Sequence, residues 1–231
     1  MAGRMLRYGV PLLLVQLSLG CTQETPSQNT ASVQPEKTAA APLPKADGKL
    51  VVAFGDSLFA GYNLPQDQGF APALERVLVA QGIKAQVFNA GVSGDTSAAG
   101  LQRLGFVLDG LRRKPDLVIV GLGANDMLRG LSPDATRANL DAILSELKSR
   151  GIKAMLAGML AAPNMGPDYA TDFNAIYPDL AKKYALALDP FFLNGVAGRR
   201  ELQLPDGMHP NARGVETIVN RVSPMVAKEL R

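Results

Sequence analysis

The sequence is poor in the two side chains that most often hold transition metals or cross-link a chain. Its 231 residues include one cysteine, Cys21, and one histidine, His209. A zinc site built from imidazole and thiolate groups needs three or four such ligands. An intramolecular disulfide needs two cysteines. The sequence therefore excludes both, and we expect no metal site of this kind.

Long hydrophobic runs and a strong excess of one charge are also missing. No stretch of about 20 apolar residues is present, which excludes a protein with several membrane spans. Apolar residues make up 47% and charged residues 19%, which is typical of a soluble globular protein. The formal charge is +3. Without residues 1–20, which include Arg4 and Arg7, 22 basic groups face 21 acidic ones, so the charge of +1 gives a nucleic-acid partner no electrostatic support.

The first 21 residues have the layout of an export signal. Arg4 and Arg7 precede a short apolar run from Val10 to Leu19, and Gly20 and Cys21 follow it. The run is too short to span a bilayer. The segment before Cys21 resembles a bacterial lipobox, in which the cysteine is lipidated and becomes the first mature residue. The alternative is an ordinary cleaved signal peptide with an incidental cysteine.

Residues 22–48 are rich in Pro, Ala, Thr and Gln and lack aromatic clusters. Such a segment buries too little apolar surface to offset the entropy of ordering it. We therefore expect a disordered linker with a reach of roughly 30 Å. An exported protein with this architecture would lie at the periplasmic face of a bacterial membrane, anchored through Cys21, or be soluble in the periplasm.

Residues 49–231 alternate between strand and helix patterns and predict an α/β domain. Short apolar runs predict buried strands over residues 50–54, 85–89, 116–121, 153–159 and 185–190. Helical spacing predicts helices over residues 70–80, 96–111, 133–150, 172–184 and 212–230. Pro178 is expected to kink or divide the fourth of these helices. Five strands that alternate with helices predict a parallel sheet covered on both faces.

Ligands of such sheets bind beyond the carboxyl ends of the strands. Residues able to do chemistry occur at these positions, in the loops 55–58, 89–96 and 123–126, and in a fourth loop at 206–209. The placement indicates one site at the carboxyl edge of the sheet.

Ser57, Asp206 and His209 together have the residue types of a Ser-His-Asp triad. A serine hydroxyl is a weak nucleophile until a base takes its proton, and His209 is the one imidazole in the chain. Asp206, three residues earlier, could fix the tautomer of the ring. The order Ser, Asp, His is that of hydrolases built on α/β sheets, but the G-x-S-x-G elbow is absent because position 59 is Phe.

An acyl transfer also needs hydrogen-bond donors for the oxyanion. The Ser57 N–H, the Gly94 N–H and the Asn125 amide are the candidates for this oxyanion hole. Each residue has an ordinary structural explanation as well: Ser57 could cap a helix, and Gly94 and Asn125 could belong to turns. Pro205-Asp206-Gly207 is a turn signal by itself, so four such explanations would have to coincide.

Four segments resemble the sequence blocks of the SGNH (GDSL-type) hydrolase superfamily, in the branch of bacterial arylesterases, acyl-CoA thioesterases and lysophospholipases. They are FGDSLFAGY at 54–62, NAGVSGDTS at 89–97, GLGANDMLRG at 121–130 and DGMHPN at 206–211. The resemblance extends over residues 49–231. It implies a flavodoxin-like three-layer α/β/α sandwich, Ser57 as nucleophile, Gly94 and Asn125 as oxyanion donors, and Asp206 and His209 as the rest of the triad. It also implies a mobile loop at 127–132 beside the substrate.

The expected activity is hydrolysis of ester or thioester bonds in small acyl substrates through an acyl-enzyme, without a cofactor or a metal. We expect the loop at 160–171 to determine acyl-chain selectivity. Three alternatives remain open. The same chemistry could remove acetyl groups from carbohydrates, the fold could serve an envelope lipoprotein without catalytic activity, or the glycine-rich loop at 91–97 could hold a nucleotide phosphate at a helix N-terminus.

Overall fold

The computed structural model of the protein describes residues 48–231. The predicted export signal over residues 1–21, with Cys21, and the predicted linker up to residue 47 lie outside the described residues. Among the residues that are described, none of the helices combines the length and the apolar character that a membrane crossing requires.

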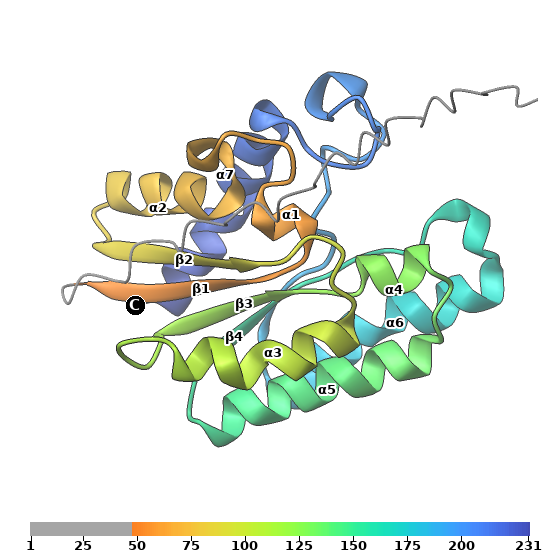
Figure 1. The fold of residues 1–231 in the computed structure, drawn as a ribbon, viewed down its shortest axis with the longest axis horizontal. Coiled ribbons are helices and arrows are strands. Elements are labelled where there is room, and N and C mark those ends of the chain that lie inside the picture. The colour runs from red at the N-terminus through yellow and green to blue at the C-terminus, as the bar shows by residue number, and fades with distance from the viewer. Residues whose placement is uncertain (1–47) are drawn as a thin grey trace, which may run out of the picture. The chain divides into compact units, whose positions relative to one another are not determined.

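Five parallel strands form one sheet in the order β2-β1-β3-β4-β5 (Figure 1). The strands are β1 (Lys49–Gly55), β2 (Ala85–Gly91), β3 (Leu117–Gly121), β4 (Ala154–Ala157) and β5 (Ala187–Asp189). Each adjacent pair is parallel. This is the strand order of flavodoxin-like folds, and it confirms the predicted sheet.

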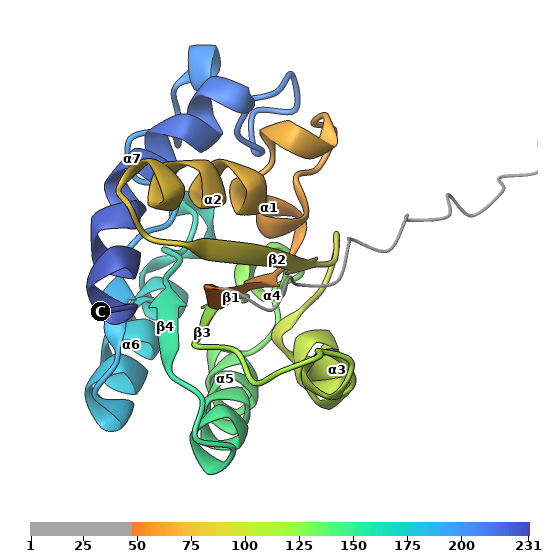
Figure 2. The ribbon, with the colours of Figure 1, turned by 90° about the vertical axis from the view of Figure 1, so that its left-hand side faces the viewer.

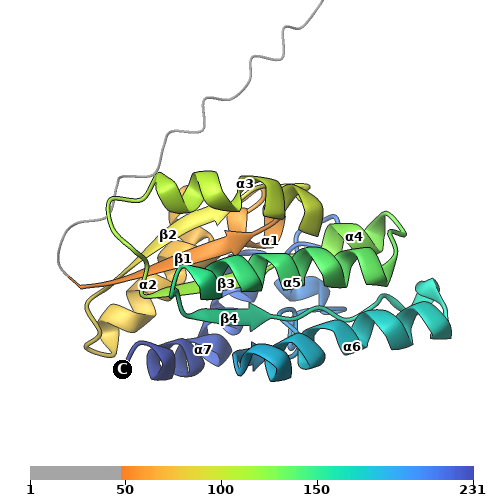
Figure 3. The same ribbon diagram turned by 90° about the horizontal axis from the view of Figure 1, so that it is seen from below.

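Helices cover both faces of the sheet. One face carries α1 (Ser57–Ala60), α2 (Phe70–Ala80) and α7 (Ala212–Glu229), as Figure 2 shows. The other face carries α3 (Ser97–Asp109), α5 (Pro133–Ser149) and α6 (Pro167–Tyr184), which lie side by side in Figure 3. A short helix, α4 (Ala124–Leu128), follows β3. The predicted three-layer α/β/α sandwich is confirmed.

The helix boundaries follow the capping residues. Thr96 accepts a hydrogen bond from the Ala99 N–H, so α3 begins at Ser97, one residue later than expected. Ser132 caps α5 ahead of a proline at its first position, as the sequence indicates. Gly151 ends α5 with a φ of 62°.

The expected division of the fourth predicted helix at Pro178 is wrong. The helix α6 continues through Pro178 and starts at Pro167, five residues before the predicted start. Phe173, Tyr177 and Leu180 are buried on its inner face, and this packing holds the helix together although Pro178 donates no hydrogen bond. The predicted loop at 160–171 therefore ends at Gly166, and part of it is a 3₁₀ turn, Pro163–Met165.

Candidate active site

Ser57 is the first residue of α1, two residues after the end of β1. Asp56, not Ser57, caps this helix: its Oδ1 accepts a hydrogen bond from the Leu58 N–H at 3.0 Å. The cap leaves the Ser57 hydroxyl free to point away from the helix. Its oxygen lies 2.8 Å from His209 Nε2.

His209 is held between Ser57 and Asp206. Its Nδ1 lies 2.7 Å from Asp206 Oδ2, and the ring of Tyr62 covers it at a centroid distance of 4.3 Å. The other carboxylate oxygen of Asp206 accepts hydrogen bonds from the backbone N–H groups of Met208, at 2.9 Å, and His209, at 3.0 Å. The backbone of residues 206–209 therefore holds the Asp206 carboxylate in place independently of the imidazole ring.

The pKa of Asp206 is lowered from 3.8 to about 2. Burial by itself works against ionisation, but the two backbone N–H groups and the His209 ring outweigh it. Asp206 is therefore a carboxylate at neutral pH. A carboxylate beside Nδ1 favours the tautomer with its proton on Nδ1, which leaves Nε2 as the acceptor for the Ser57 proton.

Three donors surround the space next to Ser57. Within the described residues, the backbone N–H groups of Ser57 and Gly94 have no hydrogen-bond acceptor. Asn125 Nδ2 donates to the Asp95 carbonyl at 3.0 Å and contacts Asp56 Oδ2 at 3.4 Å. The second contact is long for a hydrogen bond, so an oxyanion can replace it as the acceptor.

Gly94 has a φ of 86°, in the left-handed region that glycine tolerates. A Cβ at this position would meet one atom within 4 Å, a guanidinium nitrogen of Arg129 at 3.7 Å. The space in front of Gly94 is thus open to a substrate.

Asp56 is 1% exposed, and the pKa of its carboxyl is raised from 3.8 to about 7. Burial is the largest cause, the nearby charges of Asp95 and Asp126 add to it, and the hydrogen bond from Leu58 opposes it. A titratable group therefore lies directly between the nucleophile and the Asn125 amide.

Buried and partly buried polar contacts position the loops that carry Gly94 and Asn125. Arg103 pairs with Asp95 at 2.5 Å and donates to the Gly55 carbonyl at 2.9 Å. Asp126 accepts hydrogen bonds from the Ser97 N–H at 2.7 Å and the Ser97 hydroxyl at 2.5 Å. The contacts tie the β2–α3 loop to the end of β1 and to α4.

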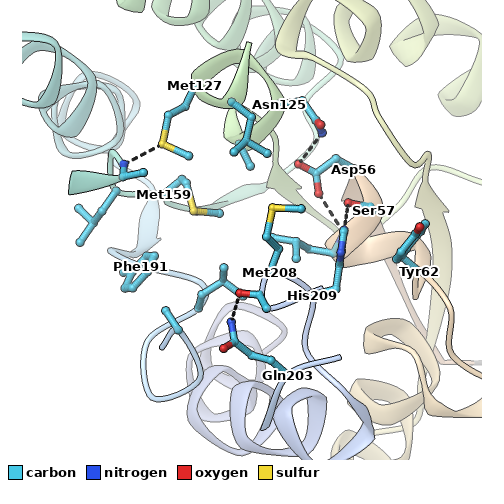
Figure 4. A pocket seen from close by; sticks show the side chains of 18 of the residues that line it. Asp56, Ser57, Tyr62, Asn125, Met127, Met159, Phe191, Gln203, Met208 and His209 are labelled. Carbon is cyan, nitrogen blue, oxygen red and sulfur yellow. Dashed lines mark hydrogen bonds between the residues drawn. The ribbon is translucent and has the colours of Figure 1, made fainter. Parts of the chain in front are cut away.

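A pocket of about 690 Å³ opens beside Ser57. Figure 4 shows Met127, Met159 and Phe191 at one end of it and Ser57 and His209 at the other. Apart from the polar groups beside Ser57, the lining is mostly apolar, with Leu58, Leu128, Leu160, Ala161, Ala162, Pro163, Leu193, Ala197 and Met208. This shape and polarity suit an acyl chain whose carbonyl group lies at Ser57.

The structure brings the sequence-predicted site residues together. Ser57, Gly94, Asn125 and His209 all line the pocket, and Asp206 lies behind His209. Cys21 is outside the described residues. The predicted loop at 127–132 lines the pocket through Met127 and Leu128, but these two residues belong to α4.

Sequence reasoning missed Asp56, Tyr62 and Arg129. Asp56 could have been found as a capping residue directly before the nucleophile. Neither the tilted ring contact of Tyr62 with His209 nor the contact of Arg129 with Gly94 has a local sequence signal, because each joins segments far apart in the chain.

No group of three or more His, Cys, Asp or Glu side chains among residues 48–231 is placed to hold a metal ion.

The structure of α3 argues against the alternative in which the glycine-rich loop at 91–97 binds a nucleotide phosphate. The Ser97 N–H, in the first turn of that helix, donates to the buried carboxylate of Asp126. A phosphate would need the N–H groups of this turn, and a carboxylate already occupies the position.

Comparisons with known proteins agree with the geometry. A family model described as the GDSL-like Lipase/Acylhydrolase family matches residues 53–216. A Pseudomonas aeruginosa protein named Esterase TesA is 37% identical over 180 residues, which cover 78% of this chain and 89% of that protein. A Vibrio mimicus protein named Arylesterase is 38% identical over 186 residues, covering 80% and 92%.

A solved structure titled AlinE4, a SGNH-hydrolase family esterase, superposes with a TM-score of 0.69 at 52% identity. The match covers 81% of this chain and all of that one. By its matched family model, its relatives and its fold, this chain belongs to the GDSL-like lipase/acylhydrolase family.

Proposed function

We propose that the protein is a serine esterase that hydrolyses carboxylic esters of apolar acyl chains. The observation that carries the proposal is the unbroken chain of contacts from Asp206 through His209 to Ser57, at 2.7 and 2.8 Å. Family membership and the names of the relatives support the same reaction class.

In the proposed reaction, Ser57 Oγ attacks the acyl carbonyl carbon while its proton passes to His209 Nε2. The carbonyl oxygen becomes an oxyanion held by the N–H groups of Ser57 and Gly94 and by the Asn125 amide. As the intermediate collapses, the alcohol leaves with the proton from His209. Water then attacks the acyl-enzyme, His209 again takes and returns the proton, and the carboxylic acid departs.

The pocket lining favours an acyl chain over a carbohydrate. Apolar side chains dominate it, whereas the hydroxyl groups of a sugar would need several polar partners. An Escherichia coli relative named Thioesterase 1/protease 1/lysophospholipase L1 is 38% identical over 166 residues, which cover 72% of this chain and 76% of that protein. Acyl thioesters and lysophospholipids, the substrates that this name suggests, present such an acyl chain, and aryl esters of apolar acids do so as well.

The deciding experiment compares the wild-type protein with Ser57→Ala on a series of p-nitrophenyl esters. We expect the variant to lose about 10⁶-fold in kcat, because the triad acts as a unit. Ser149→Ala, which removes an exposed hydroxyl at the end of α5, is the matched control. A fluorophosphonate probe should label the wild type at Ser57 and leave Ser57→Ala unlabelled. Full turnover by a purified Ser57→Ala protein, or no labelling of the wild type, would show that the fold has no such catalytic serine.

The location of the protein forms a second part of the proposal. The sequence of residues 1–21 supports export, and the position of Cys21 supports lipidation at the periplasmic face of a bacterial membrane. The 27 residues from 22 to 48 would then act as a tether. An anchored enzyme would meet esters in the membrane surface at a raised effective concentration.

A further inference from the structure

Arg129 adjoins two residues that line the pocket, Leu128 and Gly94, and lies beside the loop of the proposed oxyanion hole. It follows Leu128, which lines the pocket, and caps the end of α4. One of its guanidinium nitrogens donates to the Gly94 carbonyl at 2.8 Å. The same nitrogen would lie 3.7 Å from a Cβ on Gly94. The guanidinium therefore borders the space in which the reacting ester must lie.

Most of the hydrogen-bonding capacity of Arg129 is unused. A guanidinium carries five N–H donors, and the described residues engage it through the Gly94 carbonyl alone. Nine ion pairs and the His209–Asp206 contact connect other residues within the described range 48–231, but none includes Arg129, whose side chain is exposed. The Arg129 guanidinium is thus a positively charged group with N–H donors available to a ligand.

The acidic groups nearest to the site are already engaged. Asp95 is paired with Arg103, and Asp206 contacts His209. Asp56 is buried, with a pKa raised to about 7. The pocket lining contains no lysine and no arginine. Arg129 contacts Gly94 in the oxyanion loop and has no ion-pair partner among the described residues, so it is the cation placed to meet a negative charge beside the reacting carbonyl.

We infer that Arg129 binds an anionic group on the alcohol half of the ester, which makes it a specificity-determining residue. The inference rests on the proposed esterase function. The acyl half enters an apolar pocket, where an unpaired charge would be costly to bury. The alcohol half stays outside, where a carboxylate, sulfonate or phosphate can meet the exposed guanidinium. The alternative role of Arg129 is to position Gly94 through its carbonyl.

Two chromogenic esters with the same acyl chain separate these roles: 2-nitrophenyl butanoate, which is neutral, and 3-butanoyloxy-4-nitrobenzoate, which carries a carboxylate on the phenol. In Arg129→Gln, we expect kcat/KM for the anionic ester to fall about three- to tenfold more than for the neutral one, mainly through KM. Arg129→Lys should keep part of the preference because it keeps the charge. Added salt should reduce the preference in the wild type.

Arg112→Gln is the matched control, because Arg112 is an exposed arginine that precedes β3 at the opposite edge of the sheet. It should leave the ratio of the two esters unchanged. A third ester, 2-nitrophenyl hydrogen glutarate, carries its charge on the acyl half. Equal losses on the first two esters in Arg129→Gln would overturn the inference and leave Arg129 a positioning residue. A larger loss on the glutarate ester would overturn the assignment to the alcohol half. The proposed function is tested separately with the neutral ester: the wild type should hydrolyse it and Ser57→Ala should not.

Discussion

At the scale of single residues, Asp56 has two roles, as the cap of α1 and as a contact of the Asn125 amide. Its Oδ1 caps α1 and its Oδ2 lies 3.4 Å from the Asn125 amide, so the carboxyl joins the nucleophile to an oxyanion donor. Such a position is buried, and burial raises the pKa of Asp56 to about 7. The contact with Asn125 joins residues 69 apart in sequence. That is why local sequence signals identify Asp56 as a cap but do not reveal its link to Asn125.

The raised pKa of Asp56 predicts a particular dependence of stability on pH. Between pH 4 and pH 7 the folded protein keeps a proton on Asp56 that the unfolded chain releases. The contribution of this group to the free energy of unfolding is therefore fully present below pH 4 and is lost as the pH rises through 7, by about 4 kcal/mol in all. Asp56→Asn keeps a capping side chain and removes this slope.

Urea unfolding of both proteins at pH 4, 5.5 and 7.5 measures the difference. We expect Asp56→Asn to gain stability relative to the wild type as the pH rises. Asp172→Asn, an exposed acid on α6, serves as the control and should follow the wild type. Parallel stability curves for Asp56→Asn and the wild type would show that the Asp56 carboxyl does not hold its proton in the folded state.

At the scale of elements, three glycines let α1 lie directly on the sheet. Gly55, Gly91 and Gly121 end the neighbouring strands β1, β2 and β3 and are paired in register. A Cβ on Gly91 would come within 2.2 Å of the Ala60 backbone nitrogen, and one on Gly121 within 2.1 Å of the Phe59 ring. The glycines at the strand ends therefore determine how closely α1, which carries the Ser57 hydroxyl, packs on the sheet.

Gly91→Ala should consequently displace α1 from the sheet. The clash is with backbone, which cannot rotate away, so we expect a loss of about 1–3 kcal/mol in the free energy of unfolding. The kcat should fall as well, because Ser57 shifts relative to His209. Gly105→Ala on α3, where a Cβ would have ordinary contacts, should keep full activity and gain up to about 1 kcal/mol. Thermal unfolding and ester turnover measure both effects, and a fully active Gly91→Ala would contradict this view of α1.

The long elements could be predicted from the sequence, whereas the short ones could not. All five strands and the five long helices are present, because apolar runs and helical spacing extend over enough residues to be recognised. The four residues of α1 and the five of α4 contain too few turns to show a period. Their position depends on caps and on packing against the strand ends. The early start of α6 likewise follows from its packing, which local patterns do not reveal.

At the scale of the whole molecule, the parallel sheet explains why the functional residues of three loops distant in sequence lie close together. Every strand ends at the same edge, so Ser57 after β1, Gly94 after β2 and Asn125 after β3 become neighbours. This much follows from the strand pattern. The volume of the pocket, its methionine-rich end and the free guanidinium donors of Arg129 could not be predicted, because side chains from several loops create them together.

The proposed anchor predicts that losing Cys21 changes the location of the enzyme but not its catalytic constants on soluble substrates. All the proposed catalytic groups lie within residues 48–231. Cys21→Ser should therefore leave kcat/KM on a soluble ester unchanged. In cells fed an alkyne-tagged palmitate, we expect the wild type to take up the label and Cys21→Ser to take up none. Turnover of esters held in vesicles should be faster for the lipidated protein, because the tether confines its site to the surface. A wild-type protein that carries no label would identify residues 1–21 as an ordinary export signal, with the cysteine incidental.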